Sequence, residues 1–194
     1  MSFENSQRKL AAAAVLFLLF LTLPAFAQQP TFSRDALISA AREIMTTARY
    51  CALITRDSAG RTNARAMDPF PPETDLTVWF GTNSRSRKVR EIRRRPRVTL
   101  YYFNRENQEY VVLTGVARVV NDPKEKVKRW KDEWKAFYPN RATDYFLIEV
   151  RPERLEIISE KKKIFGNQHT WQPPRVIFKG RKNSHAIQRV SSRY

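Results

Sequence analysis

Short apolar segments of strand length, separated by turn-forming residues, fill most of the sequence between residues 50 and 158. Regular strand–helix–strand alternation is absent, which disfavours a doubly wound parallel sheet. The order favours a mainly β fold, a small and mostly antiparallel barrel with helices between its strands. We expect about seven strands, at residues 50–56, 61–67, 76–81, 97–103, 110–120, 145–150 and 155–158.

Helices are expected where apolar residues recur at helical spacing between recognisable ends. Ser33 and Asp122 are the expected N-caps of the first and last helix, and Pro96 ends the middle one. The three expected helices span residues 33–48, 86–95 and 122–137.

Two patterns predict packing rather than chemistry. The last helix carries an apolar stripe, which we interpret as core and not as a cofactor contact. Gly115 lies inside a long strand and indicates a bulge or a close backbone approach. The stripe consists of Val127, Trp130, Trp134 and Phe137.

The N-terminal 27 residues have the layout of a secretory signal peptide: a basic start, an apolar run at residues 10–23, and small residues before Gln28. The apolar run is short for a bilayer span, which needs about 20 residues. We therefore expect cleavage after Ala27, no stable membrane span in the mature chain, and a periplasmic or secreted protein. An uncleaved membrane anchor is the alternative.

The chain carries a formal net charge of +17. Such a charge suggests nucleic acid, an anionic membrane or anionic ligands as partners. Predicted export argues against nucleic acid, and a merely solvated basic surface is the remaining alternative. Basic runs at residues 93–95 and 161–163 hold part of this charge.

Few residue types for metal binding or nucleophilic catalysis are present. Cys51 is the single cysteine, which excludes an intramolecular disulfide, and its apolar neighbours predict a buried, inert thiol. His169 and His185 are the only histidines, so no metal-ligand cluster or Ser/His/Asp order is recognisable. Any chemistry would then come from a bound cofactor, and the catalytic residues are unknown.

A segment at residues 78–96 predicts a strand, a hydroxyl-rich turn, and a helix that opens with a basic pair. A phosphate there would gain hydroxyl donors from Thr82 and Ser86, together with free amides at the helix start. It would also gain charge-assisted hydrogen bonds from Arg87 and Lys88. The alternative is an ordinary capped helix with a basic surface.

The same segment resembles the pyridoxamine 5′-phosphate oxidase superfamily, specifically its general-stress-protein-like branch. The resemblance spans roughly residues 37–158 and lies in four motifs in the family's order. They are Gly60-Arg61 with Arg65 and Met67, Thr82-Asn83 with Ser86-Arg87-Lys88, Pro96-Arg97-Val98 with Leu100, and Leu113-Thr114-Gly115 with Ala117.

The resemblance implies split β-barrels that form homodimers and bind FMN between the subunits. It implies that Arg65 and Lys88 hold the FMN phosphate, assisted by Thr82, Ser86 and Arg87. The backbone of Ala66, Met67 and Asp68 would approach the isoalloxazine edge, and Phe80 and Gly81 would lie near the flavin end of their strand.

Two departures from the oxidases concern the reaction. Tyr110 stands where the oxidases have a glutamine contributed from the partner subunit, so flavin contact there would be aromatic. No Arg-Leu-His-Asp-Arg-type signature follows Leu155, which argues against vitamin B6 oxidation. The deazaflavin F420 is a less favoured cofactor, and haem would have only His169 and His185 as axial ligands.

The sequence therefore predicts an exported FMN-binding flavoprotein, an oxidoreductase that acts on an unknown small molecule. One alternative is a non-catalytic protein that binds a flavin or F420 in the same barrel. Another is a basic exported protein that docks on anionic envelope surfaces. The expected organisation is a signal peptide at 1–27, the split-barrel domain at 28–160 and a basic C-terminal extension at 161–194.

Overall fold

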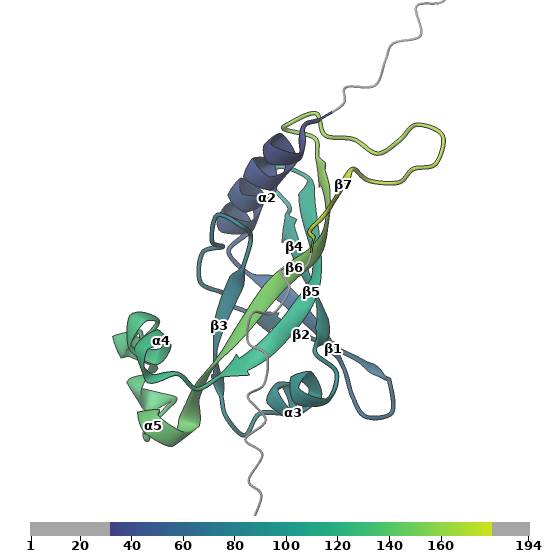
Figure 1. Cartoon of the computed structure of the whole chain (residues 1–194). Helices are drawn as coiled ribbons and strands as arrows, with labels where there is room; N and C mark the ends of the chain where they lie inside the picture. Colours follow the sequence, from purple (N-terminus) through teal and green to yellow (C-terminus); the bar gives the residue numbers. More distant parts are fainter. Residues whose placement is uncertain (1–31, 180–194) are drawn as a thin grey trace, which may run out of the picture. The chain divides into compact units, whose positions relative to one another are not determined.

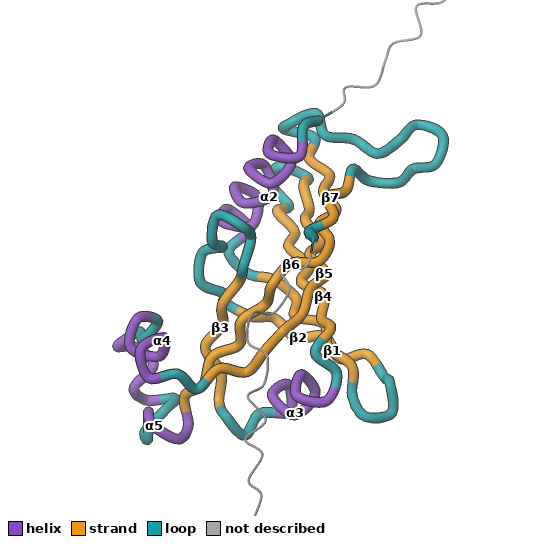
Figure 2. Tube along the Cα trace, in the orientation of Figure 1, coloured by secondary structure: helices purple, strands orange, loops and turns teal. Residues whose placement is uncertain are grey.

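The computed structural model describes residues 32–179, which form one seven-stranded sheet with short helices around it (Figures 1 and 2). The strand order is β2-β1-β4-β5-β6-β3, with β7 paired to β6, and each pair is antiparallel. This confirms the mainly β, antiparallel prediction. The strands are β1 Cys51–Arg56, β2 Thr62–Met67, β3 Val78–Asn83, β4 Arg97–Asn104, β5 Glu109–Val120, β6 Tyr145–Ser159 and β7 Arg175–Ile177.

Capping side chains satisfy an early amide at the start of two expected helices. The Ser33 hydroxyl accepts a hydrogen bond from the Ala36 amide at 3.2 Å, and the Asp122 carboxylate accepts one from Glu125 at 3.0 Å. Both expected N-caps are thereby confirmed. Within the described residues the helices are α2 Arg34–Ala48, α3 Arg87–Arg94, α4 Pro123–Lys128 and α5 Arg141–Asp144, with a 3₁₀ helix η1 at Asp132–Ala136.

The expected continuous helix over residues 122–137 is wrong, because the chain divides into α4 and η1. At the break, the Tyr145 hydroxyl donates to the Arg129 carbonyl at 2.5 Å, an acceptor that a continuing helix would need for itself. The Arg129 guanidinium lies 3.7 Å from the Trp79 ring centroid. Tertiary contacts therefore override helical periodicity here.

The apolar stripe of that segment divides in the same way. Trp130 and Trp134 pack in a small aromatic cluster with Trp79 and Tyr145, as a core prediction requires. Val127 and Phe137 are instead 68% and 72% exposed. The four residues therefore do not form a single apolar face.

The expected division into strands at 145–150 and 155–158 is also wrong, since β6 runs through both without interruption. Thr114 pairs with Arg154 and Gly115 pairs with Pro152, which leaves Glu153 as the extra residue of a bulge. A proline is tolerated at such a position because the bulge interrupts the ladder. The predicted bulge or close approach at Gly115 is confirmed.

The main core lies between the sheet and α2, whose buried face consists of Leu37, Ala40, Ala41, Ile44 and Met45. Ile164 and Val176 belong to this core although they follow Lys161. The short strand β7 also lies beyond Lys161 (Figure 1). Part of the expected C-terminal extension therefore completes the sheet.

Several predictions lie outside the described residues: the signal peptide at 1–27, His185, and the end of the extension at 180–194. Among residues 32–179, no helix combines the length and apolar character that crossing a membrane would require. Cys51 is buried as expected, and burial raises the pKa of its thiol to about 12.

Candidate cofactor-binding site

The turn between β3 and α3 brings the two predicted hydroxyls together. The Thr82 and Ser86 hydroxyl oxygens lie 3.2 Å apart, and Thr82 is buried. Ser86 occupies the N-cap position of α3 without a side-chain capping bond. Its hydroxyl thus leaves the first amides of α3 to other acceptors, as an anion site at a helix start requires.

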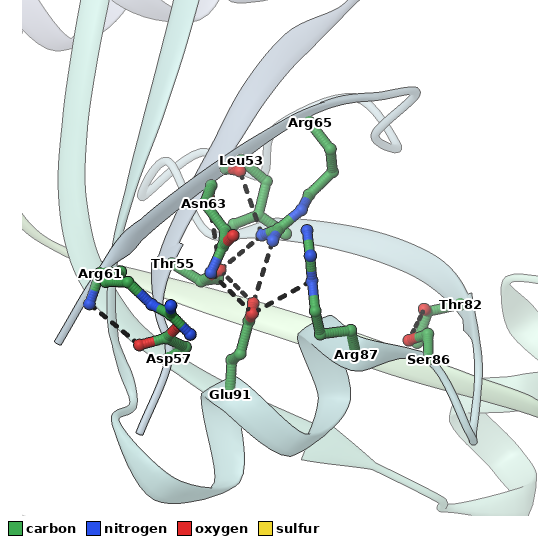
Figure 3. A network of polar contacts seen from close by, with 10 residues as sticks. All are labelled: Leu53, Thr55, Asp57, Arg61, Asn63, Arg65, Thr82, Ser86, Arg87 and Glu91. Atoms are coloured by element: carbon green, nitrogen blue, oxygen red, sulfur yellow. Dashed lines mark hydrogen bonds and ion pairs between the residues drawn. The ribbon is translucent and has the colours of Figure 1, made fainter. Parts of the chain in front are cut away.

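The two predicted arginines meet at Glu91, one helical turn beyond Arg87 (Figure 3). Arg65 Nη2 lies 3.0 Å from Glu91 Oε2, and Arg87 Nε lies 3.3 Å from Oε1. Glu91 is only 4% exposed. Glu91 is not among the predicted site residues, and its i,i+4 spacing from Arg87 is the signal in the sequence that points to this pair.

Thr55 and Asn63 complete the surroundings of this carboxylate (Figure 3). The Thr55 hydroxyl donates to Glu91 Oε2 at 2.5 Å, and the Asn63 amide donates to Oε1 at 3.0 Å. Arg65 Nη1 in turn donates to the Thr55 hydroxyl at 2.5 Å and to the Leu53 carbonyl at 3.3 Å. We call Thr55, Asn63, Arg65, Arg87 and Glu91 the Glu91 network.

Lys88 is half-buried next to this network. Burial lowers the pKa of Lys88 from the usual 10.5, the positive charge of Arg65 lowers it further, and the Glu91 carboxylate raises it. Burial disfavours the charged form of such a lysine, and an anion bound beside it would stabilise that form. The site therefore contains three cations and one carboxylate.

A pocket of about 250 Å³ opens beside the Glu91 network. Arg87 and Glu91 line it, together with Arg90 and Arg94 of α3 and the turn at Asp57 and Ser58. Of the Glu91 network, Arg87 and Glu91 thus border a hollow in the surface.

The backbone predicted to approach the flavin lies on an edge strand. In the described sheet β2 pairs with β1 alone, with Ala66 opposite Ala52 and Met67 opposite Cys51. Half of the backbone groups of such an edge are free for another acceptor or donor. Asp68 follows the strand and lies 3.7 Å from the charged nitrogens of both Arg49 and Lys131.

Phe80 and Gly81 contribute to packing rather than to an open surface. Phe80 is fully buried in the main core. A Cβ on Gly81 would lie 2.4 Å from Cζ3 of Trp134, so the indole ring occupies the space above this glycine. Neither residue presents a side chain to solvent, and contact with a cofactor would fall to their backbone.

Tyr110 lies on the opposite face of the sheet from Arg65. Residues directly paired on neighbouring strands share a face of the sheet. Arg65 is aligned across the strands with Leu53, Leu100 and Leu113, whereas Tyr110 is paired with Phe103. Leu100 and Phe103 are three residues apart on β4 and therefore face opposite ways. One chain consequently brings Arg65, Thr82, Ser86, Arg87 and Lys88 to one region and leaves Tyr110 apart from them.

The described residues contain few side chains suited to binding a metal ion or haem. Within residues 32–179 no group of three or more His, Cys, Asp or Glu side chains could hold a metal ion. His169 is exposed, in the loop between β6 and β7.

Solved structures with the same fold come from several bacteria. A Clostridium acetobutylicum protein related to general stress protein 26 of Bacillus subtilis is 17% identical, with a TM-score of 0.59, over 76% of this chain and 96% of that one. General stress protein 26 of Bacillus anthracis is 20% identical, with a TM-score of 0.58, over 73% and 98%.

A third structure, from Nostoc punctiforme, is described as a pyridoxamine 5′-phosphate oxidase-related, FMN-binding protein. It is 14% identical, with a TM-score of 0.52, over 74% of this chain and 93% of that one. At such low identities the TM-scores show a shared fold, the split barrel. No curated protein sequence matches the chain.

The family model described as pyridoxamine 5′-phosphate oxidase like matches residues 37–165, about two thirds of the chain. The match includes β1 to β6 and every predicted site residue. The chain therefore belongs to the pyridoxamine 5′-phosphate oxidase-like family.

Proposed function

We propose that this protein binds FMN, with the FMN phosphate at the start of α3, and acts as an oxidoreductase on a small molecule. The observation that carries the proposal is the meeting of Arg65, Arg87 and Lys88 beside the Thr82–Ser86 hydroxyl pair. Guanidinium, ammonium and hydroxyl donors around a helix start form a donor set that suits a phosphomonoester. The FMN-binding Nostoc protein with the same fold supports this choice.

Bound FMN would supply hydride or electron transfer, while the chain binds and orients it. Arg65, Arg87 and Lys88 would neutralise the phosphate, and Thr82 and Ser86 would donate hydroxyl hydrogen bonds. The free edge of β2 at Ala66 and Met67 would offer backbone groups to the flavin ring. Bleaching of the bound flavin by a nicotinamide donor, followed by substrate-linked reoxidation, would distinguish an enzyme from a protein that only binds FMN.

Lys88→Ala is expected to weaken FMN binding by about 1.5–3 kcal/mol, because one charge-assisted hydrogen bond to the phosphate is lost. This corresponds to a roughly 10- to 150-fold higher Kd, measured by flavin fluorescence titration. In the unchanged protein, FMN affinity should decline with rising pH before an ordinary lysine would titrate, because the pKa of Lys88 is lowered. Lys88→Arg should remove this alkaline decline.

Lys126 provides the matched control for this experiment. Burial lowers the pKa of Lys126 as it does that of Lys88, but Lys126 lies on α4 and donates to Asn121 and the Ala142 carbonyl. Lys126→Ala should leave FMN affinity unchanged. Equal FMN affinity of Lys88→Ala and the parent protein would refute the assigned phosphate site.

We further propose a homodimer in which the partner subunit supplies Tyr110 to the flavin. Tyr110 and Arg65 lie on opposite faces of one sheet, so a second copy is needed to bring both to one ligand. Tyr101 and Phe103, beside Tyr110, are 38% and 52% exposed, and the Tyr101 ring lies 6.1 Å from that of Tyr110. An exposed aromatic group of this kind is typical of an interface core.

Phe103→Glu is expected to convert the dimer to a monomer in sedimentation velocity, since it places a charge in the proposed apolar interface. FMN binding should weaken in the same variant, because the partner's tyrosine is lost. Phe137→Glu is the control, as Phe137 is 72% exposed but lies beyond η1. A Phe103→Glu protein that remains dimeric would exclude this face as the interface.

We also propose that the protein is exported. The signal-like layout of residues 1–27 supports it, and the +17 charge suits an exterior rich in anions. N-terminal sequencing of the protein recovered from the periplasm or medium should begin at Gln28.

A further inference from the structure

Glu91 places a negative charge in a site proposed to bind an anion. Its carboxylate is 4% exposed, accepts hydrogen bonds from β1 and β2, and forms an ion pair with Arg87 of α3. Oε2 accepts from Thr55 and Arg65, while Oε1 accepts from Asn63 and lies near Arg87 Nε, so both oxygens are engaged. Because apolar residues often replace buried ion pairs without loss of stability, folding alone does not explain this arrangement.

The Glu91 carboxylate restrains both arginines while leaving other N–H groups of each for a ligand. Arg87 approaches it through Nε, which directs the two Nη groups elsewhere. Arg65 uses Nη2 toward Glu91 and Nη1 toward β1. A guanidinium held at one edge is pre-organised for paired hydrogen bonds to a phosphate at another.

The carboxylate also sets the charge of the site. Arg65, Arg87 and Lys88 carry three positive charges, and Glu91 reduces the formal sum of these four groups to +2, which matches the charge of about −2 on a phosphomonoester. The charged groups that act on Lys88 are Arg65 from β2, which lowers its pKa, and Glu91 from α3, which raises it. Glu91 thus helps to keep Lys88 protonated.

We propose that Glu91 is the positioning residue of the phosphate site: it orients Arg65 and Arg87 and sets a net charge suited to a phosphomonoester. This inference rests on the proposed function. It predicts that changes at Glu91 affect recognition of the FMN phosphate and leave the affinity for riboflavin, which has no phosphate, nearly unchanged.

Glu91→Gln tests the proposal because it keeps the side-chain shape and replaces one acceptor oxygen by an amide donor. That donor faces the donors of the network, so one arginine must turn away. The Kd for FMN is expected to rise about tenfold or more, while the Kd for riboflavin changes less than about threefold. The alkaline decline of FMN affinity should move to lower pH, since Lys88 loses the carboxylate that raises its pKa.

Glu149→Gln is the matched control. Glu149 is likewise buried and contacts two arginines, Arg118 and Arg151, but it lies on β6 outside the site. This variant should change stability without changing the ratio of FMN to riboflavin affinity.

Glu91→Asp provides a second variant, used whether or not Glu91→Gln folds. It keeps the charge but is one carbon shorter, so FMN affinity should fall while the alkaline decline stays in place. An unchanged FMN to riboflavin ratio in the folded Glu91 variants would overturn the positioning role while the proposed function stands. A parent protein that binds no FMN would overturn both.

Discussion

Replacing Arg65 by alanine is expected to lower the free energy of unfolding by about 3–5 kcal/mol, the usual cost of removing one partner of a buried ion pair. Arg65 is the less exposed of the two arginines at Glu91, with a side chain 19% exposed against 62% for Arg87. Its loss also removes hydrogen bonds to Thr55 and Leu53. Urea denaturation followed by tryptophan fluorescence measures the change.

Two controls identify the source of this loss. Arg97→Ala removes an ion pair with Glu153, in which the side chains are 80% and 40% exposed, and should cost less than about 1 kcal/mol. Arg65→Met combined with Glu91→Leu should recover much of the stability, because no unpaired buried charge remains. A loss for Arg65→Ala no larger than that for Arg97→Ala would contradict the buried-pair assignment. The proposed function adds that Arg65→Ala no longer retains FMN.

Gly115→Ala is expected to destabilise the protein by about 3 kcal/mol, at the upper end of overpacking effects. An added Cβ would lie 2.2 Å from the Arg151 carbonyl oxygen and 3.2 Å from the Pro152 Cα. These are backbone atoms of β6, so relief requires a shift of the bulge where β5 and β6 pair. Thermal unfolding by circular dichroism should show a large fall in Tm.

Gly81 supplies the comparison for this prediction. It is also a glycine inside a strand, but its obstructing neighbour is the Trp134 side chain, at 2.4 Å. Gly81→Ala should therefore be partly rescued by Trp134→Leu, which removes the indole ring. No single side-chain change should rescue Gly115→Ala, and a nearly neutral Gly115→Ala would show that the bulge can shift freely.

Local patterns predicted most elements correctly where local physics controls them. Ser33 and Asp122 cap their helices as expected, and the residues around Pro96 separate α3 from β4. Both errors arose where distant residues intervene. The Tyr145 hydroxyl donates a hydrogen bond to the Arg129 carbonyl at the end of α4. Pairing with β5 keeps β6 continuous through Pro152.

The same difference between local and distant contacts applies to the candidate site. Thr82, Ser86, Arg87 and Lys88 lie within seven residues, so their spacing on a strand, turn and helix was sufficient to group them. Arg65 was assigned to the phosphate site only from the resemblance to the family. Glu91 was visible as a helix residue, but its role depends on Thr55 and Arg65, which are 36 and 26 residues away.

Alternation, capping and spacing among neighbouring residues were enough to predict the antiparallel class, the capped helices, the bulge or close approach at Gly115 and the basic helix start. Three features emerge only in the folded chain: Arg65 and Arg87 share one buried carboxylate, Trp134 covers Gly81, and Tyr110 faces away from the phosphate site. These contacts follow from strand register and from packing between distant segments, which neighbouring residues do not encode.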